Sequence, residues 1–330
     1  EAGIPSLVLM ERAGAAAAEL ILRRYPHTGT VTLLVGPGNN GGDGMVVARR
    51  LAEAAAAGGG WSLRVITRDG EPPATPDAAT MSAAAGRVWL SAFDPYVPAF
   101  AGDLIIDAML GTGQDGDLRD PIRGMCRWAN AQGVPIVALD VPTGVAADTG
   151  RADPDAIHAD VTVTFHADTV GLRVHPGRAH AGEVVVAPIG IPADAPVAPA
   201  AWGIAARAAA AIPRKGEGGD KYASGAVLVV AGARGMSGAA RLATTAVLRA
   251  GAGLCQAMVP GPVADLVAAG APEVMVAALP SGAPHLTPGD VDAVIAASPR
   301  FSALALGPGL GRDPATGDAV RDLVARCPLP

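Results

Sequence analysis

The residues best suited to chemistry stand in a glycine-rich stretch near the start of the chain. Residues 31–44 read VTLLVGPGNNGGDG, an apolar run followed by Gly, Asn and Asp and then by a helix expected over about 45–57. The glycines allow positive φ and let a ligand approach the backbone, and the unpaired N–H groups at a helix start attract anions. Asn39, Asn40 and Asp43 add oxygens that can hold a cation or a substrate. We interpret this stretch as a ligand-binding turn, although a glycine-rich turn with helix caps alone would have the same composition.

Two further polar loops follow apolar runs. In DAMLGTGQDGDLRDP, Asp107 ends an apolar run; in LDVPTG, Asp140 does the same and Thr143 follows it. A carboxylate at such a position has to be paired or ligated, unless it only caps the next turn. Asn40, Asp107 and Thr143 offer only oxygen ligands, so a site formed by them would suit an alkali or alkaline-earth cation rather than zinc or copper.

Strand-like and helix-like segments alternate around these loops. Strands are expected at 31–35, 63–67, 87–90, 104–108 and 135–139, and helices at 6–24, 45–57, 76–85 and 121–132. The strands are nearly continuous runs of Val, Ile and Leu, which predicts an α/β fold with a Rossmann-like, doubly wound parallel sheet. Ligands of such sheets bind beyond the carboxyl ends of the strands, so the three loops should converge on one cavity.

The alternation stops and then restarts. Residues 193–223 contain several prolines and most of the loop-like KGEGGDKYASG, which predicts a linker between a domain of residues 1–192 and a second one of residues 224–330. Further strands are expected at 226–232, 254–259, 274–278 and 303–306, with a helix ending near Ala250. The last of these strands enters GPGLGRD, a second glycine-rich loop that could equally be an ordinary α/β turn.

Composition limits the classes of function. The chain has 330 residues, 50% of them hydrophobic and 17% charged, which is typical of a globular protein with two domains. Its net charge of −6 and the lack of a Lys/Arg-rich tract argue against a nucleic-acid or anionic-membrane binder. Residues 1–22 read as an amphipathic helix rather than a signal peptide, and the three distant cysteines fit buried thiols. We therefore expect a cytoplasmic protein.

Five ordered motifs resemble the NAD(P)H-hydrate epimerase domain: SLVLMERAG, VGPGNNGGDG, DAMLGTG, LDVPTG and VTVTF…GL, which together cover essentially residues 1–192. That family interconverts the R and S forms of NAD(P)H hydrated on the nicotinamide ring. The resemblance implies a potassium ion held by Asn40, Asp107 and Thr143, and a catalytic Asp140 that touches the reacting ring. It also implies that the damaged cofactor is contacted by Asn39, Asn40, Gly41, Gly42, Asp43, Gly111, Thr112, Gly113, Gln114, Asp115, Gly116 and Asp117.

The chain departs from the family's pattern at two places. Thr143 stands where the family usually has Ser, which keeps the hydroxyl. Between Phe165 and Leu172 the chain reads HADTVG, without the Lys that the family commonly carries there. The preference between the hydrates of NADH and NADPH stays open, because the spacing does not choose among the arginines that could meet a 2′-phosphate: Arg49, Arg50, Arg64 and Arg68.

Residues 215–330 resemble the start of the ADP-dependent NAD(P)H-hydrate dehydratase domain, a relative of the ribokinase-like fold. The matching pieces are K…YASGAVLVVAG, MSGAARLATTAVLRAGAGL, PEVMV and GPGLGR. The resemblance implies that Ala239, Gly309 and Gly311 face the hydrated nicotinamide, and that the parent protein uses ADP and Mg²⁺. The family's KGxGT-like nucleotide loop and later GTGD motif have no counterpart before Pro330. We therefore expect a fragment, at both ends, of a bifunctional parent, and no dehydration by this chain alone.

Two other classes of function compete with the enzyme hypothesis. A non-catalytic dimerisation scaffold, as in decapping enhancers, is disfavoured because NNGGD, Asp107 and Asp140 occur together and the charge balance is acidic. A Rossmann oxidoreductase would need GxGxxG in the loop at 36–44, which departs from that frame. The expected partner is the small molecule NAD(P)HX, with no nucleic acid and no membrane, and the expected assembly is a homo-oligomer.

Overall fold

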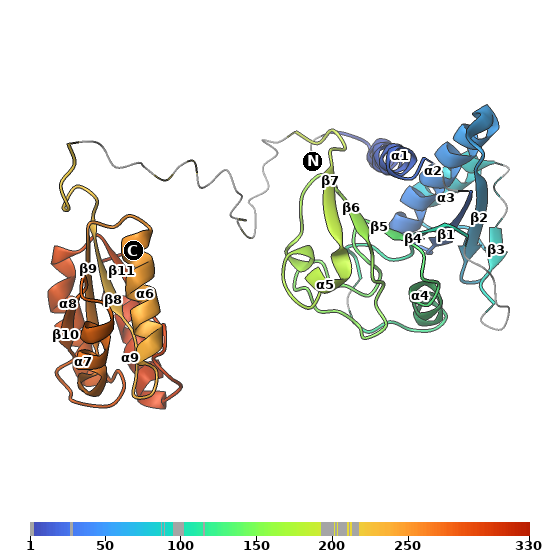
Figure 1. Ribbon diagram of the computed structural model, residues 1–330. Helices are drawn as coiled ribbons and strands as arrows, with labels where there is room; N and C mark the ends of the chain where they lie inside the picture. The colour runs from blue at the N-terminus through green and yellow to red at the C-terminus, as the bar shows by residue number, and fades with distance from the viewer. Residues whose placement is uncertain are drawn as a thin grey trace. The chain divides into compact units, whose positions relative to one another are not determined.

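The computed structural model describes residues 3–26, 29–86, 88, 90–94, 102–114, 116–192, 201, 203, 210, 212 and 218–330. Arg87 and Trp89 of an expected strand, Asp115 of an expected loop and most of the expected linker 193–223 lie outside the described residues. The chain forms two compact units, Glu1–Trp202 and Gly203–Pro330 (Figure 1). Each unit is described by itself.

The first unit is built on a seven-stranded parallel sheet in the order β3-β2-β1-β4-β5-β6-β7. Its strands are β1 (Thr30–Val35), β2 (Ser62–Thr67), β3 (Leu90–Ala92), β4 (Leu104–Ala108), β5 (Ile136–Leu139), β6 (Val161–Phe165) and β7 (Glu183–Ala187). The chain winds outward from β1 to β3 and then returns to β4 on the other side of β1. This reversal between β1 and β4 confirms the doubly wound α/β sheet and marks the crevice where such sheets bind ligands.

Helices cover both faces of this sheet. They are α1 (Ser6–Arg24), α2 (Asn39–Ala54), α3 (Pro76–Ala85), α4 (Ile122–Asn130) and α5 (Arg178–Ala181), with short helical turns η1 (Ala55–Gly59) and η2 (Val170–Leu172). In Figure 1, α1, α2 and α3 lie on one face and α4 on the other. The alternation along β4 fits this arrangement: Leu104 and Ile106 join the core under α1 and α2, whereas Ile105 packs with Met125 of α4.

The expected start of α2 is wrong by six residues. The helix begins at Asn39 rather than at Met45, so that the glycine-rich stretch forms its first turns. Positive φ does not explain these glycines, since none of those between 36 and 44 has it. They are needed for close approach instead, because a Cβ on Gly41 would collide with the carbonyl oxygen of Gly36, and one on Gly44 with Ala108. Packing therefore overrides the low helix propensity of glycine.

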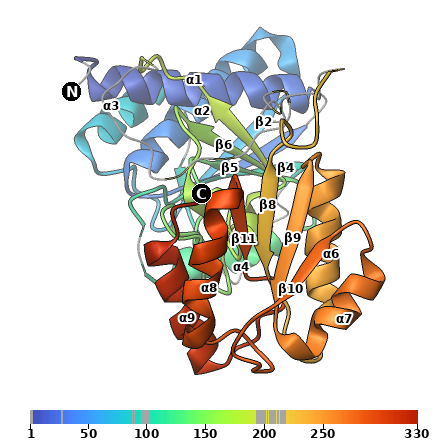
Figure 2. The same cartoon turned by 90° about the vertical axis from the view of Figure 1, so that its left-hand side faces the viewer.

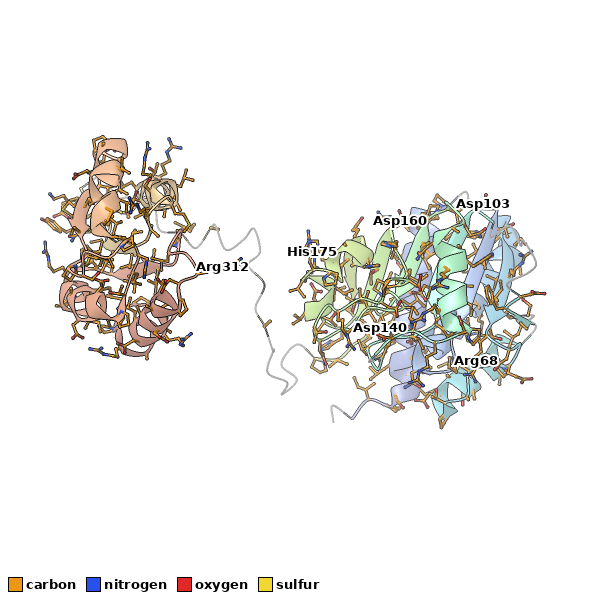
Figure 3. All side chains as sticks on the ribbon, turned by 90° about the horizontal axis from the view of Figure 1, so that it is seen from below. Arg68, Asp103, Asp140, Asp160, His175 and Arg312 are labelled. Carbon is orange, nitrogen blue, oxygen red and sulfur yellow. The ribbon has the colours of Figure 1, made fainter. Side chains whose placement is uncertain are left out.

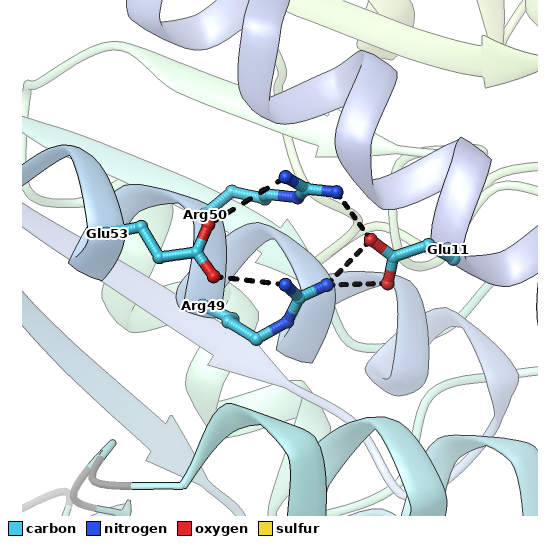
Figure 4. Close-up of polar contacts among 4 residues, drawn as sticks. All are labelled: Glu11, Arg49, Arg50 and Glu53. Atoms are coloured by element: carbon cyan, nitrogen blue, oxygen red, sulfur yellow. Dashed lines mark hydrogen bonds and ion pairs between the residues drawn. The ribbon is translucent and has the colours of Figure 1, made fainter.

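The crossing of α1 over α2 is fixed by a close contact and an ion-pair network. Gly14 of α1 faces Val46 of α2, where a Cβ would not fit. Nearby, the Glu11 carboxylate accepts hydrogen bonds from the guanidinium groups of Arg49, at 2.6 Å, and Arg50, at 2.7 Å (Figure 4). Arg49 also donates to Glu53. Both arginines are thereby engaged between the two helices.

The second unit carries a four-stranded parallel sheet in the order β10-β9-β8-β11. Its strands are β8 (Ala226–Val230), β9 (Leu254–Val259), β10 (Met275–Ala278) and β11 (Ala303–Leu306). Its helices are α6 (Ser237–Arg249), α7 (Gly261–Gly270), α8 (Val291–Ala297) and α9 (Pro314–Arg326), with η4 (Pro288–Asp290) and η5 (Ser298–Arg300). Figure 2 shows α6 and α7 on one face and α8 and α9 on the other, each pair with its own apolar cluster.

Most expected elements are confirmed. The helices expected at 6–24 and 76–85 and the strands at 104–108, 254–259 and 303–306 have the expected bounds, whereas the strand expected at 87–90 is found at Leu90–Ala92. Within the described ranges, no helix is both long enough and apolar enough to cross a membrane.

Candidate active site

A cavity of about 970 Å³ opens at the carboxyl ends of the central strands of the first unit. It is lined by the start of α2, by the segment that follows β4 and by the residue that follows β5. Of the residues expected to contact a substrate, the cavity brings together Asn39, Asn40, Asp43, Gly111, Thr112, Gly113, Gln114, Gly116, Asp117 and Asp140. Gly41 and Gly42 do not line it, because they face packed neighbours: the Gly36 carbonyl and Pro73 for Gly41, and Met10 and Ala78 for Gly42. Asp115 lies outside the described residues.

Asp140 is held in an unusual conformation at the inner wall of the cavity. Its φ of 65° lies in the left-handed region, which costs energy for a residue other than glycine and is most frequent at functional sites. Its backbone N–H donates to the Val163 carbonyl at 2.8 Å, and its Oδ2 accepts a hydrogen bond from the Thr112 N–H at 2.7 Å. A Cβ on Gly111 would lie 2.5 Å from this Oδ2, so glycine is needed beside it. These contacts aim the carboxyl group into the cavity.

Burial raises the pKa of two carboxyl groups at this wall. Desolvation raises the pKa of Asp140, and hydrogen bonds from Thr112 oppose the rise. Desolvation also raises the pKa of Asp43 to well above its ordinary range, and the nearby charge of Asp140 adds to the rise. Two neighbouring carboxyl groups with raised pKa values form an arrangement suited to acid–base chemistry.

Behind the cavity wall, a cluster of oxygen atoms surrounds Asp107. This fully buried carboxylate accepts hydrogen bonds from the Thr143 backbone N–H at 2.8 Å and from the Thr143 hydroxyl at 2.7 Å. Asn40 lies close by, since its Nδ2 donates to the carbonyl oxygens of Leu110 and Leu139, and the Thr143 hydroxyl contacts that same Leu110. The structure thus brings Asn40, Asp107 and Thr143 into one network.

The described residues give this network no positively charged side chain to balance Asp107. In the described part of the chain, no cationic side chain contacts Asp107, and burial raises its pKa to about 6. The buried Oδ1 of Asn40 has no hydrogen-bond partner there either. No group of three or more His, Cys, Asp or Glu side chains within the described ranges could hold a metal ion. A cation at this place would therefore be bound by carboxylate, amide, hydroxyl and carbonyl oxygens, which suits an alkali-metal ion and not a transition metal.

Two side chains hold the segment after β4: Gln114, which was expected only to contact the substrate, and Asp153, which the sequence did not single out. Gln114 accepts a hydrogen bond from the Gly144 N–H at 2.9 Å, which links this segment to the loop after β5. Asp153, whose side chain is 2% exposed, accepts from the Leu118 N–H at 2.9 Å and pairs with Arg123 of α4. Asp153 lies in an irregular segment without a motif, so that only the folded structure indicates its role.

In the second unit, the expected substrate residues lie close to one another. Gly309 has a φ of 69°, and a Cβ on it would come within 2.6 Å of the Ala239 Cβ. Gly311, with a φ of 87°, lies beside Met236. The loop after β11 therefore packs directly on the start of α6, at the carboxyl ends of the strands.

Both units of the chain match known protein families. Residues 6–171 match the family model described as YjeF-related protein N-terminus, and residues 227–329 match the model described as NAD(P)H-hydrate dehydratase. The bifunctional NAD(P)H-hydrate repair enzyme Nnr of Pyrobaculum aerophilum is 37% identical over 98% of this chain and 64% of its own length. The NAD(P)H-hydrate epimerase of Limosilactobacillus fermentum is 39% identical over 56% of this chain and 86% of its own length.

The bifunctional relative of Moorella thermoacetica is 35% identical over 99% of this chain, which again spans 64% of the relative's length. The chain thus covers about two thirds of the bifunctional relatives and most of the epimerase. It belongs to the YjeF-related protein family, in the two-domain arrangement of the NAD(P)H-hydrate repair enzymes to which it is similar over nearly its whole length.

Proposed function

We propose that the first unit catalyses the interconversion of the R and S hydrates of NADH and NADPH. The observation that carries this proposal is the placement of Asp140, whose carboxyl group is turned into the cavity by a left-handed backbone and held by the Thr112 N–H. The similarity to the L. fermentum epimerase over 86% of that protein supports it.

Epimerisation requires one acid–base group and a cavity wall that tolerates positive charge on the nicotinamide ring. The hydrated carbon carries a hydroxyl next to the ring nitrogen, and loss of this hydroxyl as water leaves an iminium-like cation. Water then adds back to either face. Asp140 donates a proton to the departing hydroxyl, stabilises the cation as a carboxylate, and takes a proton back from the water that adds. A positioned acid–base group typically contributes about 100- to 10,000-fold. Asp43 lies beside it, and burial together with the Asp140 charge raises the pKa of Asp43, which favours the protonated form that can donate a hydrogen bond.

Asn40, Asp107 and Thr143 are the residues that would hold a potassium ion. Their fit to a monovalent cation is supported by the uncompensated Asp107 carboxylate and by the unpartnered Asn40 Oδ1. When bound, such an ion would supply positive charge that organises the loops, since a monovalent ion polarises bonds only weakly. The chemical step itself is assigned to Asp140.

Epimerisation by the full chain tests this proposal. The two epimers are resolved by chromatography, and the spontaneous rate is subtracted. We expect Asp140→Asn to lose at least about 100-fold in kcat, because the amide keeps the Thr112 hydrogen bond but cannot transfer the proton. Asp160→Asn is the matched control: Asp160 accepts a hydrogen bond from the Ile136 N–H and lies at the opposite end of the sheet (Figure 3). Unchanged epimerisation by Asp140→Asn would remove Asp140 from the mechanism.

For the whole protein, a second activity follows from the second unit. We propose that residues 1–192 form the epimerase domain, 193–223 a linker and 224–330 the first part of an ADP-dependent dehydratase domain. Ala239, Gly309 and Gly311 would face the hydrated ring, and ADP and Mg²⁺ would serve the complete domain. The match of residues 227–329 to the dehydratase model supports this assignment. We further propose a cytoplasmic homo-oligomer that repairs the damaged cofactor.

A further inference from the structure

The cavity of the first unit extends towards β2, beyond the wall that carries Asp140. A second hollow of about 170 Å³ lies between the ends of β1 and β2 and the segment 69–74. The two spaces share Pro37 and Arg68, which lie at their junction. Figure 3 shows Arg68 at the same end of the sheet as Asp140, opposite to Asp103 and Asp160.

The distance across the sheet suits a dinucleotide. Arg68 follows β2 and Asp140 follows β5, and three strand spacings in the order β2-β1-β4-β5 amount to about 14 Å. The start of α2 lies between them, and its first turn has no side-chain cap. In doubly wound sheets a pyrophosphate lies at such a helix start, so that the two nucleosides extend to either side. With the reacting ring at Asp140, the adenosine half would extend towards β2.

Positive charge in this space is scarce. Among the described residues that line the two hollows, only Arg68 and Arg119 are basic, whereas six are acidic: Asp43, Asp69, Glu71, Asp117, Asp120 and Asp140. Arg119 belongs to the segment after β4, and Arg68 is the basic residue on the adenosine side. A phosphate group bound on that side would have to meet Arg68.

The structure also shows which of the four arginines that could meet a 2′-phosphate lies at the cavity. Arg49 and Arg50 are bonded to Glu11 and Glu53 between α1 and α2 (Figure 4). Arg64 lies within β2 and lines neither space. Arg68 lines both.

The turn that carries Arg68 is well defined. The Gly70 N–H donates to the Thr67 hydroxyl at 2.8 Å, and the Asp69 carboxylate accepts from the Glu71 N–H and from the Arg68 Nε. No other hydrogen bond of the Arg68 guanidinium is formed within the described ranges, and its side chain is 48% exposed. The guanidinium is thus oriented through Nε, and its two terminal nitrogens can form a paired contact with a phosphate.

We propose that Arg68 binds the 2′-phosphate of the substrate, so that this protein binds the hydrate of NADPH more tightly than the hydrate of NADH. This inference rests on the proposed epimerase function, because it takes the hydrated dinucleotide as the occupant of the cavity. A residue directly after β2 is well placed for this role, since acidic residues in this region of dinucleotide-binding sheets bind the ribose 2′-hydroxyl and arginines accommodate the 2′-phosphate.

The test compares kcat/KM for the two hydrates, measured with the 330-residue chain. For Arg68→Ala we expect a loss of about 10- to 100-fold with the NADPH hydrate, as for a charge-assisted hydrogen bond, and less than about threefold with the NADH hydrate. Arg68→Lys keeps the charge without the planar pair of donors and should fall between. Arg64→Ala, at an arginine within the preceding strand β2, should change neither value. If Arg68→Ala lowered kcat/KM equally for both hydrates, Arg68 would contact the pyrophosphate that they share. If it lowered neither value, Arg68 would contact no phosphate group of the substrate. Either result overturns the proposal.

A binding experiment separates this inference from the proposed function. Calorimetric titration with adenosine 2′,5′-bisphosphate and with 5′-AMP requires no turnover. We expect the unmodified chain to bind the bisphosphate about tenfold or more tightly than 5′-AMP, and Arg68→Ala to lose this difference. If the unmodified chain epimerised neither hydrate, the proposed function would fail while the titration still tested Arg68. If it epimerised both hydrates but showed no preference for the bisphosphate, the Arg68 proposal alone would fail.

Discussion

The proposed potassium site predicts that withdrawal of potassium destabilises the first unit, because Asp107 would then be a buried charge without a counter-ion. Its hydrogen-bond partners among the described residues are Thr143 and the Met109 N–H. Burial raises the pKa of Asp107 from its ordinary 3.8 to about 6. Keeping this carboxylate ionised above neutral pH therefore costs the folded protein about 3 kcal/mol. A potassium ion beside it can recover up to about that amount.

Tryptophan fluorescence isolates the unit concerned. All four tryptophans of the chain, Trp61, Trp89, Trp128 and Trp202, lie within Glu1–Trp202. Urea unfolding followed by this signal is compared in potassium chloride and in tetramethylammonium chloride of equal ionic strength, because the larger cation cannot enter the network. We expect potassium to raise the unfolding free energy by about 3 kcal/mol at saturation, or the melting temperature of this unit by roughly 6 to 12 °C.

The pH dependence follows from the sign of the pKa shift. A carboxyl group with a raised pKa favours the folded state at low pH, and this contribution is lost as pH rises through about 6. The ion binds the ionised group, so that its effect should be large at about pH 7.5 and nearly absent at about pH 4.5. Asp107→Asn should show equal stability in the two salts. The reasoning is refuted if the unmodified chain is equally stable in both salts, or if Asp107→Asn keeps the potassium effect.

Three further outcomes are expected. Gly111→Ala would place a Cβ 2.5 Å from Asp140 Oδ2 and displace this carboxylate. It should therefore lower the kcat of epimerisation by about 100-fold while changing the urea midpoint little. An unchanged kcat would contradict the close contact between residue 111 and Asp140. Asp43→Asn removes a carboxyl group whose pKa is raised by burial and by Asp140, so its stability relative to the unmodified chain should improve steadily from about pH 4 upward; a constant difference would disprove the shift. Gly309→Ala should destabilise the second unit by roughly 1 to 3 kcal/mol, measured as faster hydrogen exchange in β8 and β11. The added methyl group would occupy the space of the Ala239 side chain. Adding Ala239→Gly to the same chain should therefore restore part of the protection.

Five of the seven strands described in the first sheet were predictable, because most of them are short, largely apolar runs, whereas β6 and β7 were not among the expected strands. β4, with Leu104, Ile105 and Ile106, is buried on both faces, so that no other assignment satisfies its side chains. The convergence of the loops after β1, β4 and β5 also follows from parallel strands, since their carboxyl ends meet at one edge of the sheet. The contact between Asp107 and Thr143 is a direct consequence of this geometry.

Other features depend on packing that no local pattern encodes. The start of α2 at Asn39 could not be predicted, since glycine disfavours helix and only contacts with Gly36 and Ala108 explain its presence. The exclusion of Gly41 and Gly42 from the cavity has the same cause. Among the arginines, only the structure shows that Arg49 is taken up by Glu11, while Arg68 lies at the cavity.

Hydrogen bonds connect the oxygen network around Asp107 to the backbone beside Asp140. The Thr143 hydroxyl accepts a hydrogen bond from the Leu110 N–H, and Leu110 stands two residues before Thr112, whose N–H holds the Asp140 carboxylate. Asn40 joins the same segment through the Leu110 carbonyl and reaches the end of β5 through the Leu139 carbonyl, directly before Asp140. Any change in the charge balance around Asp107 is therefore transmitted by these hydrogen bonds to the two backbone positions that orient Asp140. A cation bound at the proposed site would thus act on the proposed catalysis by positioning Asp140, without touching the substrate.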